Sequence, residues 1–174
     1  GVDLAKAIKS KETIVVVGNE NEHATKVALS GEAVKFCTQK SQLGTGDAVK
    51  VALEGFKIKS KYTLIKYGDT PFVKSNTIKK MISKAERGFE FIFLGFQAQT
   101  KNSYGKFKLG PRGTLIDIIE KNETEYNSPE SLSNSGIVLA QSSIIVDLIQ
   151  KITNNNAKRE YYLTDIVKLA AKHG

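Results

Sequence analysis

The sequence contains one cysteine, Cys37, and no tryptophan in 174 residues. A single cysteine excludes an intrachain disulfide framework and a cysteine-based zinc or iron–sulfur site, and it favours a reducing compartment. No apolar run approaches the ~20 residues that span a bilayer, and no signal-peptide pattern is present. We therefore expect a soluble, cytoplasmic protein with no membrane partner.

Arginine is also scarce. The sequence has 26 lysines and arginines against 18 acidic residues, and only Arg87, Arg112 and Arg159 are arginines. Proteins that read nucleic acid rely on the planar arginine side chain, which pairs with guanine edges and phosphates. The lysines are scattered among acidic residues, which is typical of a solvated surface with a few cations left to face phosphate groups. We expect no nucleic-acid partner.

Long polar linkers and internal repeats are absent, and apolar segments alternate in a strand–helix order through the first half of the chain. The β-branched run at 13–18 is typical of a strand in a parallel sheet. The expected strands are 13–18, 34–38, 62–67, 89–97, 104–109, 114–120 and 137–140; the expected helices are 2–10, 22–29, 47–56, 75–87, 142–152 and 161–172; and 122–133 is expected to be a loop. This pattern predicts a three-layer α/β sheet in a single domain, 1–174.

The loop after the second expected strand contains Gln39, Gly44 and Thr45 directly before a helix. Ligands of open α/β sheets bind at the carboxyl ends of strands, where glycine admits a close backbone approach and a helix N-terminus favours an anion. The Gln39 amide suits a nucleobase edge. A tight strand-to-helix turn without a ligand is the alternative interpretation.

Two further segments carry polar groups. Asp69 follows a hydrophobic strand in the segment YGDTP at 67–71, where a carboxylate can hold a divalent cation that bridges phosphates. An Asx-turn before the proline is the alternative. The segment NNNAKREYYLTD at 154–165 begins as a loop, and its Glu160 and Thr164 are predicted to lie one helical turn apart on one face.

These segments together form a family pattern: QKSQLGTG at 39–46, YGDTP at 67–71, SYGK at 103–106, NSG at 134–136 and NNNAKREYYLTD at 154–165. The sequence resembles the uridyltransferase domain of bacterial bifunctional N-acetylglucosamine-1-phosphate uridyltransferase/glucosamine-1-phosphate acetyltransferase. The resemblance implies a Rossmann-like, three-layer mixed sheet of the sugar nucleotidyltransferase (GT-A-like) type. It also implies transfer of a uridylyl group from UTP to N-acetylglucosamine 1-phosphate, which yields UDP-N-acetylglucosamine, a cell-envelope precursor, and pyrophosphate.

The resemblance also implies roles for individual residues. Asp69 would bind Mg²⁺ as the catalytic metal ligand. The nucleotide would be bound by Gln39, Gly44, Thr45, Tyr67 and Gly68, and the sugar by Gly105, Glu120, Asn134, Glu160, Tyr162 and Thr164. Such a reaction depends on positioning and charge neutralisation, so it needs no nucleophilic side chain. The YGD and Gly-rich elements also occur in glucose-1-phosphate nucleotidyltransferases, and the 154–165 segment favours the acetamido sugar.

The sequence departs from the family at both ends. It contains no strand followed by a loop of the form LAAGxGTRM, no second metal-binding asparagine and no acetyltransferase domain. We therefore expect an incomplete domain whose first strand is missing, and whose gap is covered by a complementing fragment or a second copy, or removed by rearrangement of the sheet. The chain alone is then expected to have little or no activity. The alternative function is an inactive remnant or split-gene fragment that keeps a partial sugar-nucleotide pocket.

Overall fold

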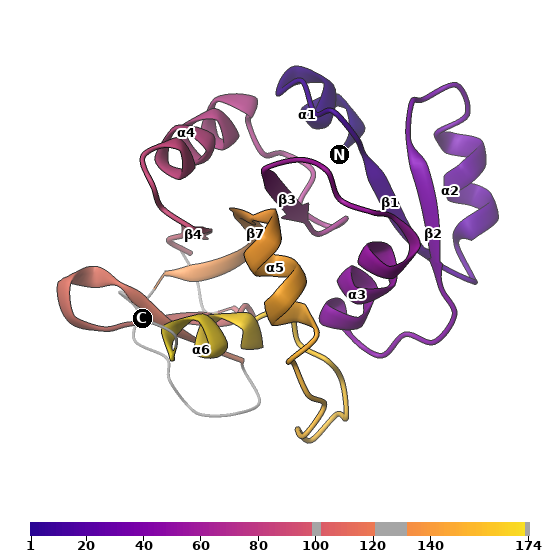
Figure 1. Ribbon diagram of the computed structural model, residues 1–174. Helices are drawn as coiled ribbons and strands as arrows, with labels where there is room; N and C mark the ends of the chain where they lie inside the picture. The colour runs from indigo at the N-terminus through magenta and orange to yellow at the C-terminus, as the bar shows by residue number, and fades with distance from the viewer. Residues whose placement is uncertain (99–101, 121–131, 173–174) are drawn as a thin grey trace.

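The computed structural model describes residues 1–98, 102–120 and 132–172 (Figure 1). Its helices are α1 (Val2–Ala7), α2 (Glu22–Ala28), α3 (Thr45–Gly55), α4 (Ser75–Glu86), α5 (Ser142–Ile149) and α6 (Asp165–Ala171), with a short 3₁₀ turn, η1 (Pro111–Gly113). Its strands are β1 (Ile14–Gly18), β2 (Lys35–Gln39), β3 (Tyr62–Lys66), β4 (Phe91–Phe96), β5 (Lys106–Leu109), β6 (Leu115–Ile119) and β7 (Ser133–Gln141). No helix within the described ranges is long and apolar enough to cross a membrane.

Strand β7 is the centre of the larger sheet. It pairs antiparallel with β3 along one edge and with β4 along the other, so β3 and β4 run parallel to each other on either side of it. Near its start, β7 also pairs with β5, which forms an antiparallel hairpin with β6. The larger sheet is therefore mixed: β3 and β4 run in one direction, and the strand between them, β7, runs in the other.

Most of the core consists of two apolar layers that follow the two-residue alternation of β7, and a third cluster joins the β5–β6 hairpin to α6. Val138 and Ala140 face a cluster formed with α5, α6 and the segment before α6. Ile137 and Leu139 face the opposite way, onto α4 and the partly buried side of α1. Helices therefore cover both faces of this sheet, as the ribbon shows for α4 and α5 (Figure 1), and the larger sheet has the predicted three layers.

Strands β1 and β2 form a separate, two-stranded parallel sheet. Helix α3 connects this small sheet to the rest of the molecule, because it packs against β1 and β2 and also against α5 (Figure 1). Among the described strands, none is hydrogen-bonded to both β1 and β3. The structure therefore contains two sheets with separate edges. The sequence pattern predicts a single sheet.

Two predicted elements differ in ways that affect the site. The strand expected at 137–140 begins at Ser133, because the Asn134 amide donates to the Gly105 carbonyl (2.8 Å) and Ser133 pairs with β4. The helix expected at 161–172 begins only at Asp165. The preceding backbone is tied to the turn before α3, since the Tyr161 amide donates to Leu43 (2.7 Å) and Gly46 donates to Tyr161 (2.8 Å).

Candidate active site

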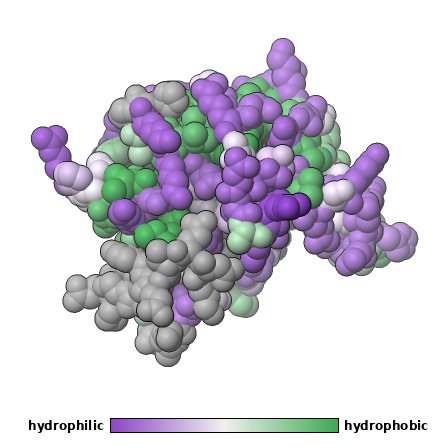
Figure 2. Space-filling model, turned by 90° about the horizontal axis from the view of Figure 1, so that it is seen from below, coloured by the Kyte–Doolittle hydropathy of each residue, from purple (hydrophilic) through white to green (hydrophobic). Residues whose placement is uncertain are grey.

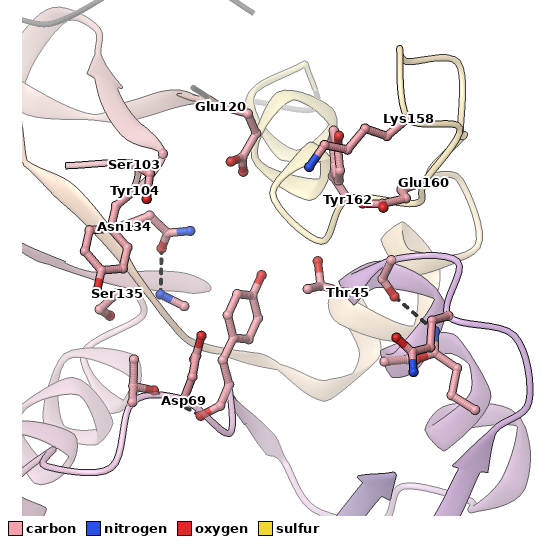
Figure 3. Close-up of a pocket in the computed structure, with 18 residues that line it drawn as sticks. Thr45, Asp69, Ser103, Tyr104, Glu120, Asn134, Ser135, Lys158, Glu160 and Tyr162 are labelled. Atoms are coloured by element: carbon pink, nitrogen blue, oxygen red, sulfur yellow. Dashed lines mark hydrogen bonds between the residues drawn. The ribbon is translucent and has the colours of Figure 1, made fainter. Parts of the chain in front are cut away.

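A cavity of about 670 Å³ opens between the N-terminus of α3 and the ends of β3 and β7 (Figure 3). Its lining comes from segments far apart in the sequence: Gln39, Gln42, Gly44, Thr45, Ala48, Tyr67, Asp69, Thr70, Ser103, Tyr104, Gly105, Glu120, Asn134, Ser135, Gly136, Lys158, Glu160 and Tyr162. A cavity of this size accommodates a nucleotide-sized ligand. Because its polar groups come from so many elements, the site exists only in the folded chain.

The turn at Gly44 brings the first side of the cavity against the segment that precedes α6. Gly44 has φ +109°, and a Cβ atom there would lie 2.5 Å from the Tyr161 carbonyl oxygen. Only glycine adopts this conformation and this approach without strain. The Thr45 hydroxyl accepts a hydrogen bond from the Leu163 amide (3.1 Å), which holds the two segments together.

Gln39, at the end of β2, is oriented by two acceptors. Its Nε2 donates to Asp47 Oδ2 (2.7 Å) and to the Gly44 carbonyl (3.1 Å). Asp47 lies in the first turn of α3, where a negative charge is favoured by the helix dipole. The side-chain amide of Gln39 is therefore held in one orientation beside the cavity.

Tyr67 and the turn that follows β3 form the floor. The Tyr67 carbonyl accepts hydrogen bonds from Thr70 Oγ1 (3.0 Å) and from Lys66 Nζ (2.7 Å), which fixes the turn that presents Asp69 to the cavity. Burial raises the pKa of the Tyr67 phenol; the Thr45 hydroxyl opposes this effect, and the charges of Glu120 and Asp69 add to it. Burial lowers the pKa of Lys66, and the Asp69 carboxylate opposes that shift.

The opposite side of the cavity is built around Glu120. The Thr164 hydroxyl donates to Glu120 Oε1 (3.0 Å), and a Cβ on Gly105 would lie 3.3 Å from Glu120 Oε2. Asn134 is buried beside them, and its Oδ1 accepts from the Gly136 amide (3.1 Å). Figure 3 shows Glu120, Asn134 and Tyr162 facing a common space.

Asn156 shapes the loop that carries Lys158 and Glu160. Its Nδ2 donates to the Glu160 carbonyl (2.5 Å), and its Oδ1 accepts from the amides of Lys158 and Glu160 (both 3.2 Å). Glu160 and Thr164 were predicted to share a helix face, and that prediction is wrong. The backbone bonds of Tyr161 keep this segment out of a helix, so Glu160 lines the cavity while Thr164 is buried behind Glu120.

Most of the predicted site residues meet in this cavity. Those that line it are Gln39, Gly44, Thr45, Tyr67, Asp69, Gly105, Glu120, Asn134, Glu160 and Tyr162. Gly68 is not among the lining residues, and Thr164 contributes through its hydrogen bond to Glu120. Sequence reasoning did not single out Tyr104, Ser135 or Lys158 as site residues. Each lies inside an identified motif (103–106, 134–136 and 154–165), so treating every polar residue of these motifs as a candidate would have included them.

Asp69 is one of three carboxylates of the cavity lining, with Glu120 and Glu160, that could hold a divalent cation. The described residues contain no cluster of three or more His, Cys, Asp or Glu side chains that could hold a metal ion by themselves. Mg²⁺ is commonly bound through one or two carboxylates together with substrate phosphates. An exposed carboxylate at the cavity fits that mode, in which the phosphates of the ligand supply further oxygens.

The mixed α/β sheet carries a polar cavity at the ends of its strands, the usual place for a ligand site in open α/β sheets. The structure is similar to a crystal structure of UDP-glucose pyrophosphorylase complexed with UDP-glucose, with a TM-score of 0.72 and 15% identity, over 99% of this chain and 74% of that chain. At this identity the likeness establishes the fold.

The chain belongs to the nucleotidyl transferase family, whose model matches residues 3–174. It is 41% identical over 143 residues, 81% of this chain, to the bifunctional protein GlmU of Wolbachia sp. subsp. Brugia malayi, of which it covers 34%. It is 32% identical over 174 residues, 99% of this chain, to the GlmU of Caldicellulosiruptor saccharolyticus, of which it covers 37%. The chain thus spans about a third of the length of these curated relatives, and the matches confirm the resemblance seen in the motifs.

Proposed function

We propose that this chain carries the site for uridylyl transfer from UTP to N-acetylglucosamine 1-phosphate, giving UDP-N-acetylglucosamine and pyrophosphate. One observation carries the proposal: Gln39, Thr45 and Glu160 on one side and Glu120 and Asn134 on the other line a single cavity, with Asp69 on its floor. Gln39 and Thr45 suit a nucleobase and phosphates, and Glu120, Asn134 and Glu160 suit sugar hydroxyl and amide groups. The match to bifunctional GlmU proteins supports the same substrates.

The reaction needs positioning more than acid–base chemistry. An oxygen of the sugar phosphate, already ionised at neutral pH, forms a bond to the α-phosphorus of UTP. The bond between that phosphorus and the oxygen bridging to the β-phosphate breaks, and its electron pair leaves with pyrophosphate. The protein's task is to hold the two phosphates in line and to balance their charge. Tyr67 and the rigid turn after β3 would orient the reacting groups.

We propose Mg²⁺ as the cofactor, with Asp69 as its protein ligand in this chain. When bound, the cation would neutralise phosphate charge and align the phosphate oxygens. The negative lining makes such help necessary: Asp69, Glu120 and Glu160 face the cavity, and Lys158 is its one basic lining residue among those the structure describes.

The direct test is release of pyrophosphate from UTP and N-acetylglucosamine 1-phosphate in the presence of Mg²⁺, with glucose 1-phosphate as the competing acceptor, measured with and without a peptide that supplies a hydrophobic strand and a Gly-rich loop. We expect the acetamido sugar to be preferred, because Glu120 and Asn134 offer a carboxylate and an amide to the cavity that can pair with the acetamido N–H and C=O. Asp69→Ala should remove Mg²⁺-dependent turnover, whereas Asp147→Ala, which removes an exposed carboxylate from α5, should not. Unchanged turnover in Asp69→Ala would contradict the metal assignment.

A second candidate function is that of a fragment with a partial pocket that becomes active on complementation. The observation in its favour is that β1 and β3 belong to separate sheets, so the backbone groups of β1 do not pair with those of β3. We propose that an extended segment, or a second copy of the chain, completes the sheet between them. Adding a peptide with a hydrophobic strand and a Gly-rich loop should then raise turnover. Complementation would be contradicted if turnover were the same with and without the peptide while the chain remained a monomer in solution.

A further inference from the structure

Asp47 lies in the first turn of α3 and does not line the cavity, yet it accepts a 2.7 Å hydrogen bond from a residue of the cavity lining, Gln39. The Gly44 carbonyl accepts from the same Gln39 Nε2 at 3.1 Å. A carboxylate and a carbonyl can only accept hydrogen bonds, so both require the NH₂ group of the amide to face them.

This requirement decides which atom of Gln39 is left for a ligand. If the amide were turned over, its Oε1 would face two acceptor oxygens, one of them charged, and two hydrogen bonds would be lost. Oxygen and nitrogen of a glutamine are told apart by their partners, and here both partners are acceptors. Nε2 is therefore engaged with the protein, and Oε1 is the atom with capacity to accept from a molecule in the cavity.

We infer that Asp47 is a positioning residue that makes Gln39 an obligatory acceptor, so that the site selects a nucleobase presenting a ring N–H, as uracil does. This inference rests on the proposed nucleotide site. Uracil carries an N–H at N3, which donates to Oε1. Cytosine has a bare acceptor nitrogen at the same position, so two lone pairs would face each other. A site whose polar group is left unpaired or opposed rejects the wrong ligand strongly.

The structure separates this role from a role in stability. Asp47 also favours the start of α3 through the helix dipole, and any neutral residue at 47 would lose that contribution. Such a loss lowers the free energy of unfolding but affects uracil and cytosine ligands equally. A change in the ratio of the two affinities is therefore the property that a purely structural role would leave unchanged.

The test measures binding of UDP, CDP and 3-methyluridine diphosphate to the full chain by titration, with Asp47→Leu, Asp47→Asn and Glu54→Gln beside the unchanged protein. We expect UDP to bind at least about tenfold more tightly than the other two, since one hydrogen bond in a confined site is worth about that factor. Asp47→Leu should reduce the preference for UDP over CDP about fivefold. Part of the preference should remain, because the Gly44 carbonyl still accepts from Gln39 Nε2. Asp47→Asn keeps an oxygen that accepts from Gln39 and should therefore retain most of the preference for UDP over CDP. Glu54 is exposed on the same helix, so Glu54→Gln should change nothing.

The outcomes distinguish the inference from the function on which it rests. Failure of the unchanged chain to bind any of the three nucleotides would overturn the proposed function and the inference together. Binding of UDP with an unchanged preference over CDP in a folded Asp47→Leu would overturn the inference alone. If that variant does not fold, equal binding of UDP and 3-methyluridine diphosphate by the unchanged chain overturns the inference, and a clear preference for UDP that Asp47→Asn largely retains supports it.

Discussion

Gly136 lies directly against the ring of Tyr67: a Cβ atom on Gly136 would be 2.4 Å from Tyr67 Cδ2. Gly136 also has φ +71°, a conformation that side chains rarely adopt. The central strand β7 and the floor of the cavity therefore meet at a point where only glycine fits. The orientation of Tyr67 depends on the absence of a side chain on the neighbouring strand.

Gly136→Ala should displace Tyr67 and weaken binding of UDP-N-acetylglucosamine. The change adds backbone strain and a steric clash, which together cost about 2–4 kcal/mol of unfolding free energy. Gly113→Ala is the matched control, because Gly113 has φ +73° with nothing within 4 Å of the added atom. Urea unfolding should show a smaller loss for the control, and titration should show no loss of binding. Equal effects of the two changes would contradict the role given to Gly136.

Thr164→Val should weaken sugar-nucleotide binding although Thr164 does not line the cavity. The change keeps the shape of the side chain and removes the hydroxyl that donates to Glu120 Oε1. A hydrogen bond to a charged group contributes about 1.5–3 kcal/mol, so unfolding free energy should fall by a similar amount. Thr63→Val removes a hydroxyl that bonds to Ser142 Oγ instead. Both variants should be less stable by chemical denaturation, but only Thr164→Val should lose affinity in a titration.

Lys158→Gln should weaken the binding of a phosphorylated ligand. Lys158 lines the cavity, and Figure 3 shows its side chain extending toward the space between Glu120 and Tyr162. An exposed charge pair at contact distance is worth about 1 kcal/mol, which corresponds to about fivefold in affinity. Arg159→Gln removes a neighbouring charge that is not part of this lining and should leave affinity unchanged at moderate salt. A comparable loss in both variants would mean that the loop charge acts only at long range.

Tyr67→Phe should make the protein less sensitive to alkaline unfolding. Burial raises the pKa of the Tyr67 phenol above its ordinary value of 10.0, so the folded state retains a proton that the unfolded chain releases. The associated stability is complete below pH 10 and is lost as the pH rises through the folded-state pKa. The stability advantage of the unchanged protein over Tyr67→Phe should therefore shrink above pH 10, as measured by urea unfolding at a series of pH values. A difference independent of pH would contradict burial of an ionisable phenol at this position.

The surface lysines are partly paired with acidic residues nearby. Figure 2 shows hydrophilic residues distributed over the visible face, interrupted by apolar groups, rather than gathered in one tract. Several lysines are paired with acids, including Lys6 with Glu32, Lys26 with Glu22 and Lys151 with Asp147. The +8 formal charge is thus spread over the chain and partly compensated locally, which agrees with the sequence-based expectation of a solvated lysine-rich surface.

The sequence by itself determined the mixed α/β class, the family and most of the residues that line the cavity. Local patterns carry that information: apolar alternation indicates strands, and short polar segments such as YGDTP and QLGTG mark the ends of strands and the starts of helices. These patterns predict Gln39, Asp69 and Glu160 as site residues, and all three line the cavity.

Only the tertiary structure decided how those residues cooperate. Backbone pairing of Tyr161 with the turn at Leu43 overrides helical periodicity and separates Glu160 from Thr164. The hydrogen bond from Gln39 to Asp47 and the contact of Gly136 with Tyr67 join residues 8 and 69 positions apart, respectively. Such contacts depend on where folded segments meet, and the free energy of long-range packing is not encoded in the periodicity of any one segment. The sequence therefore specifies the parts of the site, and the packing of β7, α3 and the segment before α6 determines their arrangement.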